Sequence, residues 1–306
     1  MITRTELNKE KQRKIIDEEK REKRKKLIKF FFKLVMFILI FTTVFFLYIT
    51  YIANTKIIVK EQRIISKKIP SNFNGLKVIQ FSDIHFGTTV FEKELNNLVK
   101  IINSRNPDLV IFTGDLIDKN YKPTSKEQEK IINELKKINA SIGKYAVNGD
   151  EDKEQFNTIL NQSDFIILNN EYDLLYKDKN NPILLIGMNS SLTKKIDINN
   201  AYKYFEEENH NANIYTISIL HEPDSVDKII SNYNSDLFLA GHSHNGQIKI
   251  PHFGTIVRKN GAKKYYNEYY KLKNSKLFIS SGIGTNDSGI RIFAHPSINL
   301  FRLSNE

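Results

Sequence analysis

One segment of the sequence, residues 34–52, runs for 19 residues without a charge, a proline or a glycine ("LVMFILIFTTVFFLYITYI"). About 20 apolar residues are needed for a helix to cross a bilayer, and Phe30 to Phe32 extend the run past Lys33, whose long side chain can reach the headgroups. A buried core helix is the alternative, but the complete lack of charge favours the membrane. We therefore predict a membrane-spanning signal-anchor helix over residues 30–52.

The distribution of charge predicts how this helix is oriented. Residues 1–33 contain 13 Lys and Arg against six acidic residues, a surplus of seven in a chain whose formal net charge is +11. The positive flank precedes the span, so we expect the basic tail, residues 1–29, in the cytoplasm and the rest of the chain outside. The tail acts as a topology signal or as a polybasic segment attracted to anionic lipid. Tyr51 stands where a signal peptidase needs a small residue, so we expect an uncleaved, single-pass anchor in the cell membrane.

The remainder of the chain is predicted to form a short tether and one α/β domain. Residues 53–75 alternate apolar and polar side chains before a turn cluster, which indicates a tether and an edge strand. From residue 76 to residue 306, apolar strand-like runs alternate with helical segments, the helices being expected at 91–104, 124–139, 153–161 and 199–209. Such runs indicate sheets that are covered on both faces. The chain has no cysteine, which excludes disulfides and zinc–thiolate sites.

Polar side chains gather where these predicted strands end. Five separate junctions carry Asp, His or both: Asp83 and His85; Asp115 and Asp118; Asp150, Glu151 and Asp152; His221; His242 and His244. A single Asp after a strand is often a helix cap, and a single His is often a core residue. Five junctions favour a shared crevice at the carboxyl ends of the strands, where gathered carboxylates need cations. Imidazole with carboxylate and no thiolate favours Zn, Fe or Mn, so we predict a site for two metal ions.

The same residues resemble a known family. "DIH", "GDLID", "GDED", "HEPD" and "GHSHNGQI" are similar, in order and spacing, to the five signature blocks of the calcineurin-like metallophosphoesterases, and most closely to their membrane-anchored bacterial phosphodiesterases. The resemblance covers residues 57–303. It implies a four-layered α/β/β/α sandwich with two mixed sheets, here behind one N-terminal transmembrane helix. It also implies a metal-dependent phosphoester hydrolase, a phosphodiesterase by its closest likeness, that uses a dinuclear metal site and a metal-bound hydroxide at the outer face of the membrane.

The resemblance also implies a role for each residue of the blocks. The first metal would be held by Asp83, His85, Asp115 and His244. Asp115 would bridge to the second metal, whose other ligands would be Asp150, His221 and His242. The ions would be divalent or of mixed valence, with Mn, Fe or Zn as candidates. Asp118 would orient a ligand such as His85.

The third block departs from the family pattern of Gly-Asn-His-Asp. Asp150 replaces a neutral amide and adds a negative charge, which weakens the hold on an anionic phosphate. Glu151 replaces the His that serves the leaving group, and an ordinary Glu, with a pKa of about 4.3, is a poor general acid at neutral pH. We therefore expect activated diesters or pyrophosphate-like substrates to be favoured. The alternative is a catalytically weakened metal-binding module that recognises a surface phosphate.

Other interpretations of the sequence are less favoured. "GHSHN" nearly matches the nucleophile elbow of serine hydrolases, but Asn245 occupies the position of the second glycine, and Ser243 is better explained as a spacer. The tyrosine-rich residues 263–270 could stack bases or lie at a lipid interface, and a strand with aromatic cross-strand pairs is the alternative. Residues 34–306 carry a formal charge of only +4, so no nucleic acid is expected. The expected partners are a phosphoester, soluble or linked to lipid or wall polymer, and membrane lipids through the anchor.

Overall fold

The computed structural model describes residues 4–49, 53–178, 181–207, 210–250, 254–255, 258–286 and 289–306. The last residues of the expected membrane span, 50–52, and the first three of the basic tail lie outside the described residues. The chain divides into two compact units, Met1–Thr50 and Tyr51–Glu306.

The first unit is a single helix. α1 (Arg4–Tyr48) is 45 residues long and continues without a break from the charged tail through the apolar run. The side chains of the apolar run are exposed, as Phe37 at 66% and Phe46 at 67% illustrate, which is the surface that a membrane span presents to lipid. Among the described residues, α1 is the one helix that is long and apolar enough to cross a membrane.

The second unit contains two mixed sheets of six strands each. The first sheet has the order β1 (Ile58–Ile65), β14 (Ser297–Ser304), β2 (Lys77–Phe81), β3 (Leu109–Phe112), β4 (Gly143–Ala146) and β5 (Ile166–Ile167). The second has the order β12 (Tyr269–Lys271), β13 (Lys276–Ile279), β9 (Leu237–Ala240), β8 (Thr216–Ile219), β7 (Ile183–Gly187) and β6 (Glu171–Leu175). β2 to β5 are parallel, as are β7, β8, β9 and β13. A short pair, β10 (Lys249–Ile250) and β11 (Gly254–Thr255), stands apart from both sheets.

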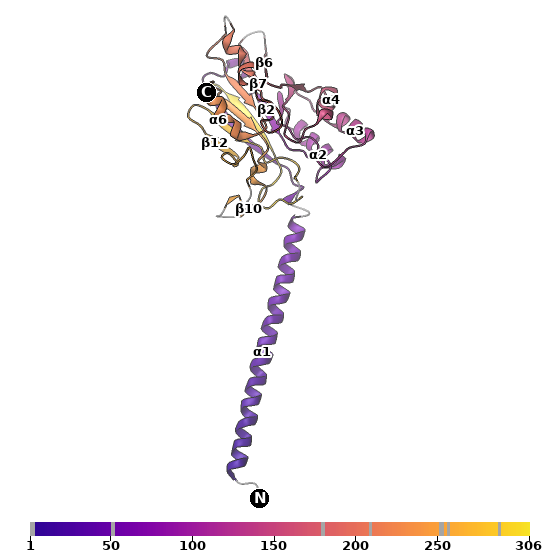
Figure 1. Cartoon of the computed structure of the whole chain (residues 1–306), viewed down its shortest axis with the longest axis vertical. Helices are drawn as coiled ribbons and strands as arrows, with labels where there is room; N and C mark the ends of the chain where they lie inside the picture. Colours follow the sequence, from indigo (N-terminus) through magenta and orange to yellow (C-terminus); the bar gives the residue numbers. More distant parts are fainter. Residues whose placement is uncertain are drawn as a thin grey trace. The chain divides into compact units, whose positions relative to one another are not determined.

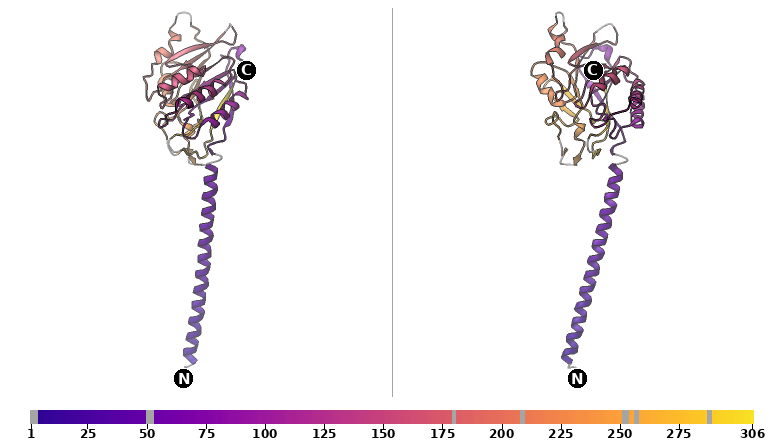
Figure 2. Two further views of the ribbon diagram at one scale, coloured as in Figure 1. Left: turned by 90° about the vertical axis from the view of Figure 1, so that its right-hand side faces the viewer. Right: turned by 45° about the vertical axis from the view of Figure 1, so that its right-hand side comes forward.

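Helices cover the outer face of each sheet. α2 (Glu92–Asn103), α3 (Ser125–Lys136) and α4 (Glu154–Gln162) pack on the first sheet and lie together on one side in Figures 1 and 2. α5 (Ile198–Ala201), α6 (Val226–Ile230) and the 3-10 turns η3 (Lys203–Glu206) and η4 (Pro223–Ser225) lie at the second sheet. The two sheets bury a third apolar layer between them, which includes Val78, Ile111, Ile217 and Leu239. The expected four-layered α/β/β/α sandwich is confirmed.

The structure corrects the predicted elements in detail. The helix expected at 199–209 is two short turns, α5 and η3, separated by Tyr202. Tyr202 is fully buried, and its hydroxyl lies 2.7 Å from the Ser218 hydroxyl and 2.9 Å from that of Ser235, so the chain is drawn onto the sheet at this point. Residues 208–209 lie outside the described residues. No helix is predicted from the sequence at the position of α6.

The prediction of an edge strand is confirmed, whereas the strand predicted over 263–270 forms only at its last two residues. β1 is an edge strand that pairs with β14 alone, and its exposed charged residues, Glu61 among them, suit an edge. The tyrosine-rich segment enters β12, where Tyr269 lies opposite Phe278 with the ring centroids 4.9 Å apart. That aromatic cross-strand pair accounts for part of the tyrosine content without a bound base.

The topology brings the five polar junctions together. Asp83, Asp115 and Asp150 follow the neighbouring parallel strands β2, β3 and β4, while His221 and His242 follow β8 and β9 of the second sheet. Parallel neighbours end at the same edge of a sheet, and a ligand crevice forms beyond those carboxyl ends. The first sheet therefore delivers the acidic groups together with His85, and the second sheet delivers the other imidazoles.

Candidate metal centre

The structure places all seven expected metal ligands in two adjoining groups. The first group contains Asp115, Asp150, His221 and His242, and the second contains Asp83, His85 and His244. Within each group, one potential ligand atom from every residue lies within 4.8 Å of the others. His242 and His244, two positions apart in the sequence, belong to different groups.

The first group has the spacing of ligands around one ion. Asp150 Oδ1 lies 2.9 Å from His242 Nδ1 and 3.2 Å from His221 Nε2, and Asp115 Oδ2 lies 3.2 Å from His221 Nε2. Both carboxylate oxygens are buried and make no hydrogen bond within the described residues. Ligands bound tetrahedrally at about 2.0–2.1 Å lie roughly 3.3 Å from one another. Lone pairs that face each other at this spacing fit a shared cation.

The second group converges in the same way. His244 Nε2 lies 3.1 Å from His85 Nε2 and 3.2 Å from Asp83 Oδ1. Asp115 Oδ2, which belongs to the first group, is 3.7 Å from His85 Nε2. One carboxylate oxygen of Asp115 therefore lies within reach of both groups.

Unusual backbone geometry is concentrated at these residues. Asp83, His85, Asp115, His242 and His244 all have positive φ, between 45° and 65°. L-residues adopt this left-handed conformation uncommonly, and strain of this kind tends to gather at functional sites. Here the left-handed conformation turns successive candidate ligands of one loop toward the crevice.

A glycine makes room for this turn after β9. A Cβ atom on Gly241 would lie 2.1 Å from Ser82 Oγ and 2.9 Å from Asp83 Oδ2. The loop that carries His242 can therefore approach the β2 loop only because residue 241 has no side chain. The His242 amide uses this approach and donates to both carboxylate oxygens of Asp83, each at 3.1 Å.

Backbone carbonyls orient both imidazoles of the first group. His221 Nδ1 lies 2.6 Å from the Thr113 carbonyl oxygen, and His242 Nε2 lies 2.6 Å from that of Asn260. A carbonyl oxygen only accepts, so these nitrogens carry the proton and donate it. When these imidazoles are neutral, the opposite nitrogens, His221 Nε2 and His242 Nδ1, have lone pairs directed into the site.

Charged side chains meet the imidazoles of the second group instead. Glu151 Oε2 lies 3.2 Å from His85 Nδ1, and Arg291 Nη2 lies 3.4 Å from His244 Nδ1. Arg291 is fully buried and donates to the carbonyl oxygens of Ser281 at 2.7 Å, Ala294 at 3.0 Å and Gly284. A buried guanidinium therefore joins the C-terminal loop to a ligand of the second group.

Asp118 lies differently from expectation. The family resemblance implies that Asp118 orients a ligand such as His85, but the carboxylate that lies beside His85 Nδ1 is that of Glu151. Asp118 Oδ1 accepts from the Asn120 amide at 2.9 Å, and its buried Oδ2 makes no hydrogen bond among the described residues. Asp118 and Glu151 line the same small cavity.

The charges of the site perturb one another strongly. Burial opposes ionisation of Asp83, but the neighbouring imidazoles, His244 foremost, outweigh it and hold the pKa of Asp83 well below its ordinary value. Burial also opposes the charged form of His221, yet Asp115 and the other carboxylates raise its pKa well above the usual range. Burial and the charge of Lys259 hold the pKa of His244 well below its ordinary value. Protons and metal ions therefore compete for the same lone pairs, and metal uptake releases protons.

Several groups that hold the site in place were not assigned a role from the sequence. The Asp152 carboxylate accepts from the amides of Asp115 at 2.8 Å, Leu116 at 2.9 Å and Gly149 at 2.7 Å, so it fixes the loop after β3 against the loop after β4. The position of Asp152 in the "GDED" block was the sequence signal that could have identified it. Arg291, in "GIRIF", and the two carbonyls that orient the imidazoles had no such signal, because only the tertiary fold brings them to the site.

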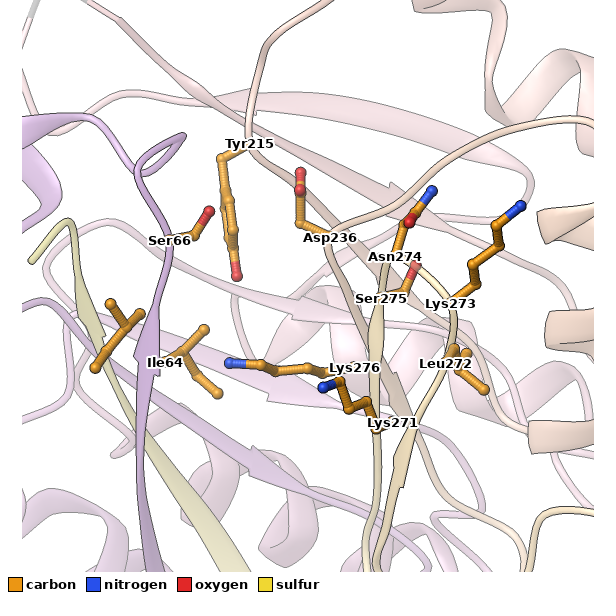
Figure 3. Close-up of a pocket in the computed structure, with 11 residues that line it drawn as sticks. Ile64, Ser66, Tyr215, Asp236, Lys271, Leu272, Lys273, Asn274, Ser275 and Lys276 are labelled. Atoms are coloured by element: carbon orange, nitrogen blue, oxygen red, sulfur yellow. The ribbon is translucent and has the colours of Figure 1, made fainter.

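A larger pocket elsewhere does not coincide with this chemistry. A cavity of about 250 Å³ is lined by Ile64, Tyr215, Asp236 and the hairpin 271–276 (Figure 3). Tyr215, Asp236 and Ser275 directly precede β8, β9 and β13, so the cavity lies at the amino ends of these strands. The ligand crevice of such a sheet lies at the carboxyl ends, which is where the two groups are.

Comparisons with known proteins agree with this geometry. Residues 76–246, more than half of the chain, match the family model "Calcineurin-like phosphoesterase". The chain is 29% identical over 261 residues to the uncharacterized metallophosphoesterase YkuE of Bacillus subtilis (strain 168), which covers 84% of this chain and 88% of that protein.

Two further relatives extend the comparison. UDP-2,3-diacylglucosamine pyrophosphatase LpxG of Chlamydia muridarum is 25% identical over 77% of this chain and 86% of its own length. A transmembrane protein with a metallophosphoesterase domain from Danio rerio is 25% identical over 76% of this chain and 54% of its own length. The family match covers the strands and all five polar junctions of the site. This chain belongs to the calcineurin-like phosphoesterase family and is a metallophosphoesterase.

Proposed function

We propose that this chain hydrolyses phosphodiesters or pyrophosphate-like esters with two metal ions, at the outer face of the membrane in which α1 is anchored. The observation that carries the proposal is the convergence of seven ligand-type side chains in two adjoining groups, with unpaired oxygens of Asp115 and Asp150 facing imidazole lone pairs. The pyrophosphatase named among the relatives supports the substrate class.

The proposed ligands divide between the ions as the two groups do. His85, His244 and Asp83 would hold one ion, and His221, His242 and Asp150 the other, with Asp115 shared. Two cations there would lower the pKa of a bound water and polarise the phosphoryl oxygens. The carbonyls behind His221 and His242 keep those imidazoles in the tautomer that a cation needs. Zn, Fe and Mn all suit this set of oxygen and nitrogen ligands.

Glu151 has a supporting role in this proposal. Its carboxylate faces His85 Nδ1 and accepts from the Lys119 amide at 3.0 Å, so it fixes His85. A carboxylate engaged in this way gives little help to a leaving group, and activated esters need little help. Asp118, which lines the same small cavity as Glu151, would support it.

Activity with defined metals tests the proposal. Full-length protein is purified in detergent, loaded with Mn²⁺, and assayed on bis(p-nitrophenyl) phosphate. The proposal expects two bound ions per chain and turnover that chelation abolishes. Two bound ions without hydrolysis of any diester or pyrophosphate would contradict it and favour the metal-binding module, which the unusual Asp150 and Glu151 make the second candidate.

Leaving-group dependence tests the part assigned to residue 151. Glu151→His restores a side chain able to protonate a leaving group near neutral pH. Its rate on alkyl phosphodiesters should rise relative to aryl phosphodiesters, compared with the unsubstituted protein. A variant that is no better on alkyl leaving groups counts against this explanation.

The absence of cysteine from the chain makes the orientation testable. Single cysteines are introduced at Lys9, in the tail, and at Lys122, on the exposed loop before α3. A membrane-impermeant maleimide applied to intact cells should label Lys122→Cys and not Lys9→Cys. The reverse pattern would place the domain in the cytoplasm and contradict the proposal.

A further inference from the structure

Three large apolar side chains are exposed beside the metal centre. Ile250 is 42% exposed, Ile290 39% and Phe293 54%. They come from two segments far apart in the sequence that run side by side. Ile248 and Ile292 form a parallel bridge, the Lys249 amide donates to the Ile292 carbonyl at 2.9 Å, and the Ile292 amide donates to the Gln247 carbonyl at 3.0 Å. We call Ile250, Ile290 and Phe293 the apolar rim.

The fold holds the rim outward while it buries a charge. In the segment from residue 289 to residue 294, Arg291 and Ala294 are buried, whereas Ile290 and Phe293 are exposed. Phe293 has a φ of 53°, a left-handed conformation that is costly for a bulky side chain. The strained backbone keeps this aromatic ring at the surface, and backbone outliers of this kind point to function.

The length of the chain ties the rim to the membrane. The Asn54 side chain donates to the Gly289 carbonyl at 2.9 Å, directly beside Ile290. α1 ends at Tyr48, so only five residues separate the apolar helix from Asn54. At most about 3.6 Å is gained per residue, so the six steps from Tyr48 to Asn54 span no more than roughly 22 Å. If α1 crosses a bilayer, the rim lies within reach of the lipid surface.

The rim also adjoins the catalytic groups. Arg291, between Ile290 and Phe293, reaches His244 Nδ1 at 3.4 Å. The β10 segment that carries Ile250 begins five residues after His244. Contact of the rim with lipid would therefore place the metal centre at the lipid interface.

We propose that the apolar rim inserts into the lipid interface and presents the metal centre to phosphoesters carried by lipids of the same membrane. This inference rests on the proposed function, that is, on a membrane-anchored phosphoester hydrolase. The occupant of the rim is the lipid surface, because apolar side chains that extend from a polar domain bind at the boundary of headgroups and acyl chains.

The chain contains no tryptophan, so one introduced tryptophan is an unambiguous reporter. Full-length Phe293→Trp is reconstituted in nanodiscs of phosphatidylethanolamine and phosphatidylglycerol, with and without brominated acyl chains. Its emission should shift to shorter wavelength and lose about half its intensity with brominated lipid, because interfacial side chains lie about 5–10 Å into the boundary.

Tyr176→Trp is the matched control. Tyr176 is 50% exposed and follows β6, whose last residue pairs with the first residue of β7, at the end of the second sheet opposite to the metal centre. Its tryptophan should be neither shifted nor quenched. If Phe293→Trp is quenched no more than Tyr176→Trp, the rim does not enter lipid and the inference is overturned.

A second experiment measures whether the apolar rim is needed for hydrolysis of a lipid-borne ester. The double variant Ile290→Ser and Phe293→Ser should hydrolyse soluble bis(p-nitrophenyl) phosphate at the normal rate but lose most of its rate on a phosphatidyl p-nitrophenyl ester in the same nanodiscs. An unchanged rate on the lipid ester would overturn the inference. If the unsubstituted protein hydrolyses neither ester, the proposed function fails, while the quenching result still decides whether the rim enters lipid.

Discussion

The two halves of the metal centre are held in different ways. His221 and His242 donate to the backbone carbonyls of Thr113 and Asn260, whereas His85 and His244 face the charged side chains of Glu151 and Arg291. Support by the backbone persists through any substitution that keeps the fold. Support by a side chain is lost with a single substitution. Substitutions should therefore change metal affinity and stability more readily in the half that contains His85 and His244.

The same comparison bears on the charge of the site. Asp150 adds a carboxylate to the half supported by the backbone, at 2.9 Å from His242. Arg291 places a fully buried positive charge beside the other half. Burying a guanidinium is costly unless it is hydrogen-bonded and faces opposite charge, and here it has three carbonyl partners near Asp83. Arg291 thus offsets part of the negative charge of Asp83 in this half.

The largest effect is expected where the two halves meet. Asp115→Asn removes a negative charge from the oxygen that both groups share, so both ions should be lost together. Activity on bis(p-nitrophenyl) phosphate should fall by about 1000-fold or more, because bound cations supply several kcal/mol of transition-state stabilisation. Asp178→Asn, an exposed carboxylate outside the site, is the control and should retain full activity. Activity within tenfold of normal would mean that Asp115 is not shared.

Stability should depend on the side-chain support of the second half. Arg291→Met leaves the carbonyls of Ser281, Ala294 and Gly284 without their donor. Each buried unsatisfied group costs about 1–3 kcal/mol, so the free energy of unfolding should drop by about 3 kcal/mol or more. Thermal unfolding of metal-free protein in detergent measures this. The exposed Arg105→Met should change it little, and a similarly small change for Arg291→Met would show that the buried guanidinium gives no support.

Metal ions should stabilise the fold by relieving repulsion within the site. Mn²⁺ at 100 times its dissociation constant should raise the free energy of unfolding by about 2.7 kcal/mol for each site filled. Melting temperature recorded against Mn²⁺ concentration gives the effect, and the Asp115→Asn variant should show a much smaller rise. An unchanged melting temperature in the unsubstituted protein would argue against ion binding in the folded state.

The smallest expected effect comes from a substitution that should weaken metal binding in only one half of the metal centre. Glu151→Gln keeps an acceptor beside His85 Nδ1 but removes the charge. Loss of such a partner costs about 10–100-fold in metal affinity, and the acceptor retained at this position favours the lower end. Titration with Mn²⁺ should show one site weakened about tenfold and the other unchanged. Glu154→Gln, at the exposed start of α4, is the control, and equal weakening of both sites would contradict the division into halves.

Much of this arrangement could be predicted from the sequence, for a physical reason. Apolar runs that end in Asp or His reveal strands whose carboxyl ends carry ligands, and parallel pairing then brings Asp83, Asp115 and Asp150 to one edge. The direction of the Glu151 side chain and the contact of Arg291 with His244 could not be predicted, because neither has a local pattern. The prediction of one helix over 199–209 is wrong because the buried hydroxyl contacts of Tyr202 outweigh helix propensity.

Metal stoichiometry tests the central claim most directly. Full-length protein and the variants His242→Ala and His244→Ala are loaded with Mn²⁺, passed through a desalting column and analysed by inductively coupled plasma mass spectrometry. Because the two imidazoles belong to different groups, we predict two ions per chain for the unsubstituted protein and one for each variant. Two ions in both variants, or fewer than two in the unsubstituted protein, would contradict the account.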